Sequence, residues 1–127
     1  MDMKMVNIDY DNIILSDEII HKVKNEVPLL VKDIIKNDLD KVILYGSCAR
    51  GDFTMKSDID IAIIAHCNRL AAQKYGAALT DVSLELSSRY LSAVVNFVCL
   101  PYDEYMEKKS WYTFYRNIDT SGEVLYG

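Results

Sequence analysis

The chain has 127 residues, of which half are hydrophobic and 26% are charged, and this composition suits one compact domain over residues 1–127. Its formal net charge of −5 argues against direct nucleic-acid binding, because a protein that binds phosphate backbones needs a basic face. No apolar run is as long as a membrane span, and the N-terminus carries acids where a signal peptide would be basic and then apolar. We therefore expect a cytoplasmic protein that does not associate with membranes.

The first predicted element is a helix that begins after Ser16. This serine can cap the helix, and Asp17 and Glu18 lie favourably in its first turn. Apolar residues then recur at helical spacing as far as Ile34. Pro28 interrupts the run, so the pattern predicts either one kinked helix or two helices that meet there.

Three strands and a further helix are predicted in the middle of the chain. Lys41–Tyr45, Asp58–Ala65 and Ala93–Leu100 are short runs rich in β-branched residues, and a helix capped by Asn68 separates the last two. The alternation of helices and strands predicts a small α/β domain in which the helices flank the sheet.

The segment after Pro101 is predicted to be weakly helical and to end in a polar turn at Asp119–Glu123. It holds more than half of the aromatic residues of the chain. These side chains can pack over the sheet as core, or they can form a surface for a partner protein, where Tyr and Trp are favoured. The two interpretations are compatible with each other.

The segment Gly46–Ile64 carries the most informative pattern, because it joins a glycine–serine turn to a pair of carboxylates. Asp58 and Asp60 open a predicted strand, so their side chains point to the same face at a backbone separation of about 6–7 Å. Two carboxylates held so close repel each other unless a cation lies between them. Mg²⁺ prefers such oxygen ligands together with water and substrate phosphates.

Three residues before this pair are suited to bind phosphate. Gly46, at the end of the preceding strand, lets the backbone approach a ligand closely, and Ser47 adds a hydroxyl and an N–H donor. Arg50 is a candidate guanidinium partner for a phosphate. A phosphate site facing a carboxylate pair indicates metal-assisted phosphoryl or nucleotidyl transfer.

The same residues resemble a known family. Gly-Ser, ten residues and then Asp-x-Asp, set in LYGSCARGD and SDIDI, resembles the nucleotidyltransferase superfamily of DNA polymerase β. The chain length resembles its minimal nucleotidyltransferases (MNT), which are often antitoxins paired with HEPN-domain toxins. The resemblance implies a small nucleotidyltransferase fold, with helices flanking a short mixed sheet of three to four strands.

The resemblance also implies roles for individual residues. Gly46 and Ser47 would bind the phosphates of ATP or another nucleotide, and Asp58 and Asp60 would hold Mg²⁺. Catalytic members of the family add a third carboxylate from a later strand. Here the only polar residue of the Ala93–Leu100 strand is Asn96, which can ligate a cation but brings no charge and cannot act as a base. Whether a second Mg²⁺ binds is therefore open, and the other candidates for a third ligand are Asp81, Glu85 and Ser92.

Two hypotheses of function follow from these expectations. The first is a Mg²⁺-dependent nucleotidyltransferase that moves a nucleoside monophosphate, AMP from ATP, onto a hydroxyl of a protein or small molecule. Its partner would be a HEPN-like protein or a second copy of the chain. The alternative, which the missing third carboxylate favours, is a catalytically weak nucleotide-binding antitoxin that acts by forming a complex.

Overall fold

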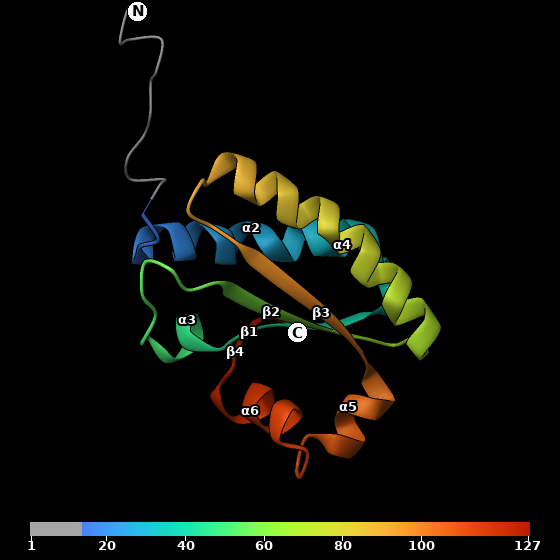
Figure 1. The fold of residues 1–127 in the computed structure, drawn as a ribbon. Helices are drawn as coiled ribbons and strands as arrows, with labels where there is room; N and C mark the ends of the chain where they lie inside the picture. Colours follow the sequence, from blue (N-terminus) through green and yellow to red (C-terminus); the bar gives the residue numbers. More distant parts are fainter. Residues whose placement is uncertain (1–13) are drawn as a thin grey trace, which may run out of the picture.

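The computed structural model describes residues 14–127 and contains one mixed four-stranded sheet with helices on both faces (Figure 1). The strand order is β3-β2-β1-β4. The central strand β1 (Leu39–Tyr45) is antiparallel to both of its neighbours, β2 (Ile59–Ala65) and β4 (Glu123–Tyr126). β3 (Val95–Pro101) runs parallel to β2 at the edge. The predicted α/β class and the mixed sheet are confirmed.

The N-terminal helix α2 spans Asp17–Ile35 and is followed by the short 3₁₀ helix η2 (Lys36–Asp38). Ser16 caps α2 as predicted, because its side chain accepts a hydrogen bond from the backbone N–H of Ile19 at 3.3 Å. Pro28 lies inside one continuous helix, so of the two alternatives the structure shows the single helix. The buried stripe of six apolar side chains outweighs the backbone hydrogen bond that Pro28 cannot donate.

The long helix α4 (Arg69–Arg89) connects the parallel strands β2 and β3, which cannot be joined by a tight turn. Asn68 caps it as predicted, with its side-chain oxygen accepting from the N–H of Ala71 at 2.8 Å. Helices α2 and α4 lie together on one face of the sheet (Figure 1) and form the larger hydrophobic core with it. The other face of the sheet is therefore left for the C-terminal segment.

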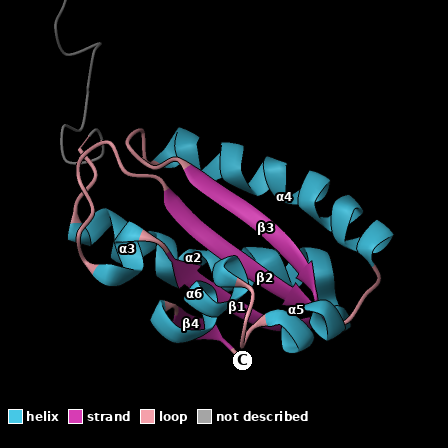
Figure 2. Cartoon of the chain, turned by 60° about the horizontal axis from the view of Figure 1, so that its bottom comes forward, coloured by secondary structure: helices cyan, strands magenta, loops and turns pink. Residues whose placement is uncertain are grey.

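The C-terminal segment forms α5 (Tyr102–Lys108), α6 (Thr113–Ser121) and β4, and it builds a smaller core on this second face. The prediction of a polar turn at Asp119–Glu123 is wrong, because α6 continues through most of it and Gly122 leads directly into β4. A four-residue strand is too short to show an alternating pattern, and it forms because β1 offers a free edge. In Figure 2, α5 lies beside the arrowheads of β2 and β3, far from the residues that begin these strands.

The aromatic residues of this segment divide between core and surface. Tyr105 and Tyr115 are buried, which confirms the core interpretation for them, whereas Trp111, Tyr112 and Phe114 are exposed. A partner surface at the exposed rings stays a prediction. Within residues 14–127, no helix is both long enough and apolar enough to cross a membrane.

Candidate functional site

The predicted site residues of the two neighbouring strands meet on the α5/α6 face of the sheet. Asp60 of β2 pairs in register with Asn96 of β3. Since Ile59 and Ile61 lie in the α2/α4 core, alternation along the strand places Asp60 on the opposite face. The side-chain amide of Asn96 donates to Asp58 Oδ2 at 2.8 Å and more weakly to Asp60 Oδ1 at 3.4 Å. The expected position of Asn96 beside the carboxylate pair is thus what the structure shows.

The fold shifts the acidity of the Asp60 carboxyl. Burial raises its pKa above the ordinary value, and the negative charge of Asp58 acts in the same direction. The amide of Asn96 opposes this by donating to the ionised form, and the charge of Arg50 does so as well. A cation beside Asp60 would therefore stabilise its ionised form, which burial and Asp58 disfavour.

The glycine–serine turn lies directly against Asp60. Gly46 follows β1 with φ 75° and ψ −156°, a conformation that is essentially restricted to glycine. A Cβ atom at this position would lie 2.7 Å from Asp60 Oδ2. Ser47 begins the short helix α3 (Ser47–Arg50), whose first N–H groups have no acceptor inside the helix. The candidate phosphate-binding backbone and the candidate metal ligand are therefore neighbours.

Cys48 and Arg50 also belong to α3 and differ in their environment. Arg50 is exposed, and its Nε lies 3.4 Å from Asp52 Oδ2, so the guanidinium is only loosely held. Cys48 is buried, and its thiol lies 3.5 Å from the carbonyl oxygen of Asp58. Burial raises the pKa of the Cys48 thiol. Cys48 is therefore a packing residue that ties α3 to the start of β2, and Arg50 is free to turn toward an anion.

The donor set fits one Mg²⁺ ion better than two. Asp58 and Asp60 offer carboxylate oxygens, and Asn96 could offer its carbonyl oxygen if the amide turned round. Among residues 14–127 no group of three His, Cys, Asp or Glu side chains could hold a metal. Glu85 pairs with Arg89 on α4, the helix that covers the opposite face of the sheet, and Asp81 belongs to the same helix. The structure thus brings neither acid of α4 to the site.

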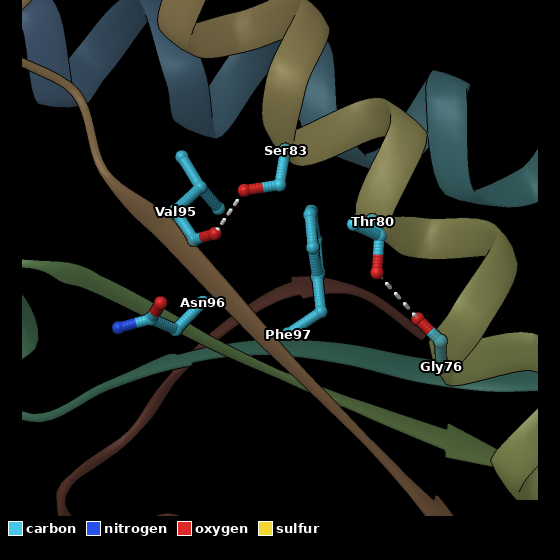
Figure 3. A pocket seen from close by; sticks show the side chains of 6 residues that line it. All are labelled: Gly76, Thr80, Ser83, Val95, Asn96 and Phe97. Atoms are coloured by element: carbon cyan, nitrogen blue, oxygen red, sulfur yellow. Dashed lines mark hydrogen bonds between the residues drawn. The ribbon is translucent and has the colours of Figure 1, made fainter.

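A cavity of about 260 Å³ lies between α4 and the edge strand β3, and Asn96 is the one residue that lines it and also contacts the carboxylates. Figure 3 shows Phe97 pointing from β3 toward α4, whereas the amide of Asn96 points away from that helix. Ser83 and Val95 both line the cavity, and the Ser83 hydroxyl donates to the carbonyl oxygen of Val95 at 2.5 Å. Asp58 is exposed and Asp60 is half-buried, and both lie at the beginning of β2, the end of the strand away from α5 (Figure 2).

Sequence reasoning missed Tyr45 as a neighbour of the site. Tyr45 lies opposite Asp60 in the antiparallel ladder, and burial together with the charge of Asp60 raises its pKa to about 12. Its ring also meets Phe114 of α6 edge-to-face, with centroids 5.8 Å apart. The position of Tyr45 immediately before Gly46 was the available signal, whereas its contact with α6 required the fold.

The family assignment rests on a comparison of the whole motif-bearing region with known families. Residues 29–127 match the family model described as polymerase beta, nucleotidyltransferase. The chain belongs to this nucleotidyltransferase family. The match covers the glycine–serine turn, the Asp58/Asp60 pair and every strand of the sheet. The resemblance that the motif suggested is thereby confirmed, and with it the class of enzyme.

Two relatives in Methanocaldococcus jannaschii carry names of protein adenylyltransferases. One is 33% identical over 99 residues, which cover 76% of this chain and 87% of the relative. The other is 45% identical over 47 residues, which cover 37% of this chain and 43% of that relative. The longer match covers more than two thirds of both chains.

Solved structures share the fold at low sequence identity. A toxin–antitoxin structure with AMP-PNP has a TM-score of 0.51 at 21% identity, covering 82% of this chain and 73% of that one. A structure described as a nucleotidyltransferase of Sulfolobus solfataricus has a TM-score of 0.50 at 19% identity, covering 84% and 82%. These two likenesses support the nucleotidyltransferase fold.

Proposed function

We propose that the chain is a Mg²⁺-dependent adenylyltransferase that moves AMP from ATP onto a hydroxyl group of a partner protein. The observation that carries the proposal is the direct approach of the Gly46 turn to Asp60, with Asp58 and Asn96 beside it. This arrangement puts a phosphate-binding backbone and a carboxylate pair at one point of the sheet. Nucleotidyl transfer is the reaction that needs both.

In this mechanism the chain mainly positions the reacting groups and neutralises the charge of the phosphates. The N–H groups at Ser47 and the guanidinium of Arg50 would hold the phosphates, and Asp58 and Asp60 would hold Mg²⁺. The ion, when bound, would neutralise negative charge on the phosphates. The acceptor hydroxyl forms a bond to the α-phosphorus of ATP while the bond from that phosphorus to pyrophosphate breaks. The proton of the hydroxyl must leave to a carboxylate or to water, since Asn96 cannot accept it.

The acceptor is proposed to be a protein of the HEPN type that forms a complex with this chain in the cytoplasm. Three features support a protein acceptor. The related M. jannaschii proteins are named for adenylyl transfer to protein, and one of the solved structures with the same fold is a toxin–antitoxin complex. Within the described residues Asp58 is also exposed and Asp60 only half-buried, so a partner could present its hydroxyl there.

Asn96 favours a second candidate function, in which the chain binds nucleotide but neutralises its partner by complex formation alone. Asn96 occupies the register position beside Asp60, and it brings an amide where a third carboxylate would complete the charge of a two-metal site. Binding of one Mg²⁺–ATP then remains feasible while transfer is slow. The two functions differ in whether the partner becomes labelled.

The test uses calorimetry with ATP and Mg²⁺ and then transfer of label from α-labelled ATP to the partner. Asp58→Asn removes one charge from the pair at constant shape, and we expect it to weaken Mg²⁺-dependent ATP binding at least tenfold. Asp33→Asn, an exposed acid of α2, is the matched control and should bind as wild type does. Unchanged binding by Asp58→Asn would refute the metal assignment. Tight ATP binding without label on the partner would select the second function.

A further inference from the structure

An aromatic groove lies at the α5–α6 connection, near the carboxylate site but outside it. Its volume is about 620 Å³, which is within the usual range for small-molecule pockets. The residues that line it are Trp111, Tyr112, Thr113, Phe114 and Asn117. The three rings are unusually exposed, at 60% for Trp111, 47% for Tyr112 and 40% for Phe114. None of the lining side chains carries a charge, so the groove suits a flat neutral group.

The rings of the groove are held in place before any ligand arrives. Trp111 donates its indole N–H to the carbonyl oxygen of Glu107 at 3.0 Å and meets Tyr112 edge-to-face at 5.9 Å. Phe114 packs against the buried Tyr115 with centroids 5.7 Å apart. Side chains fixed in this way offer their faces to a planar ligand with little loss of conformational entropy.

One side chain, Tyr45, contacts the groove on one side and precedes the proposed phosphate site on the other. Phe114 meets the ring of Tyr45 edge-to-face at 5.8 Å, with the two ring planes 87° apart. Tyr45 immediately precedes Gly46 and lies opposite Asp60 in the ladder. Phe114 is therefore the groove residue that lies nearest along these contacts to Gly46 and Ser47, which orients a ligand with its phosphates there toward the groove.

The polar lining of the groove matches one class of nucleobase. Asn117 offers an amide donor and a carbonyl acceptor side by side, which is the pattern that pairs with the N6 amino group and N7 of adenine. Stacking alone would accept any base, because every base has a π face. We propose that this groove is the adenine subsite of the protein, with Phe114 and its neighbouring rings stacking on the base and Asn117 reading its edge. The proposal rests on the proposed function for the position of the phosphates.

The experiment uses three probes and the only tryptophan of the chain, Trp111, as the reporter. The probes are Mg²⁺–ATP, Mg²⁺–tripolyphosphate, which has no base, and adenosine, which has no phosphate. We expect ATP and adenosine to quench the fluorescence of Trp111 and tripolyphosphate to bind without quenching. Base–aromatic stacking changes affinity by roughly 5- to 150-fold, so ATP should bind more tightly than tripolyphosphate by a factor in that range.

Two groove variants and one control make the test specific. Asn117→Ala and Phe114→Leu should weaken ATP binding at least fivefold and leave the affinity for tripolyphosphate unchanged, since a misfolded protein would lose both. Asn25→Ala, a change on α2 remote from the groove, should alter neither. Equal affinities of wild type for ATP and tripolyphosphate would overturn the adenine subsite. So would groove variants that bind ATP normally, including variants that lose only a partner complex, because the groove would then be a protein interface.

Failure of the proposed function has a different outcome. If Mg²⁺–tripolyphosphate does not bind the wild type but adenosine still quenches Trp111 in a manner sensitive to Asn117→Ala, the phosphate and metal assignment is wrong and the adenine subsite stands. If adenosine and ATP both leave the fluorescence of Trp111 unchanged, the subsite is refuted regardless of what tripolyphosphate does.

Discussion

Asn96→Asp is the most informative single change, because it restores the charge that this chain lacks at the carboxylate pair. In the wild type, the Asn96 amide donates to Asp58 Oδ2 at 2.8 Å and to Asp60 Oδ1 at 3.4 Å. The aspartate has nearly the same shape but presents a third negative oxygen at the same place. Without a divalent cation, the variant therefore exchanges two attractive contacts for repulsion.

The size of the effect follows from the distances. Two charges about 4 Å apart repel by about 1 kcal/mol in water and by about 4 kcal/mol in a surface-like dielectric of about 20. Asn96 is exposed, so the lower part of that range applies. The lost hydrogen bond to a charged acceptor adds about 1.5–3 kcal/mol. We expect a loss of about 3 kcal/mol in the free energy of unfolding, which lowers Tm by roughly 10 °C for a chain of this size.

Melting curves with and without Mg²⁺ measure this prediction. Mg²⁺ should recover most of the lost Tm or exceed it, because a cation that binds only the native state stabilises it. The Mg²⁺-induced rise in Tm should thus be several degrees larger for Asn96→Asp than for wild type. The matched control is Asn25→Asp, the same substitution on α2, which should respond to Mg²⁺ as wild type does. If both variants respond alike, Asn96 does not face a cation site and the reasoning fails.

Two further changes probe the same region. Burial raises the pKa of Asp60, so the stability that this group contributes is complete below its ordinary pKa and is lost as pH rises through the raised value. In Mg²⁺-free buffer, Asp60→Asn should therefore raise Tm at pH 7 and give much less gain at pH 3.5, and equal gains at both pH values would contradict the assignment. Gly46→Ala should cost about 1–3 kcal/mol in urea unfolding because of its positive φ and its contact with Asp60, and an unchanged unfolding midpoint would contradict that geometry.

The sequence predicted the parts of the site that lie close together along the chain. Gly46, Ser47, Asp58 and Asp60 belong to one strand–turn–strand unit, whose composition and spacing are local properties. The position of Asn96 could also be predicted, but only on the assumption that its strand is the neighbour of β2. The register of Asp60 with Asn96 confirms that assumption.

Features that depend on long-range packing could not be predicted in this way. The exclusion of Glu85 as a third ligand follows from the side of the sheet that α4 covers, and a helical pattern does not reveal that side. The contact of Tyr45 with Phe114 joins β1 to α6 across most of the chain. β4 was missed because its four residues form a strand only against the edge of β1.

The orientation of the Asn96 amide links the fold to the proposed chemistry. Beside two carboxylates the amide must present its NH₂ group, and in that orientation it replaces part of the positive charge that a cation would supply. A bound cation needs an oxygen ligand, so the same side chain would have to turn by half a rotation about its terminal bond. Asn96 therefore stabilises the metal-free pair in one orientation and can ligate a cation in the other. An aspartate at this position can only ligate a cation. A leucine can neither donate to the carboxylates nor ligate a cation.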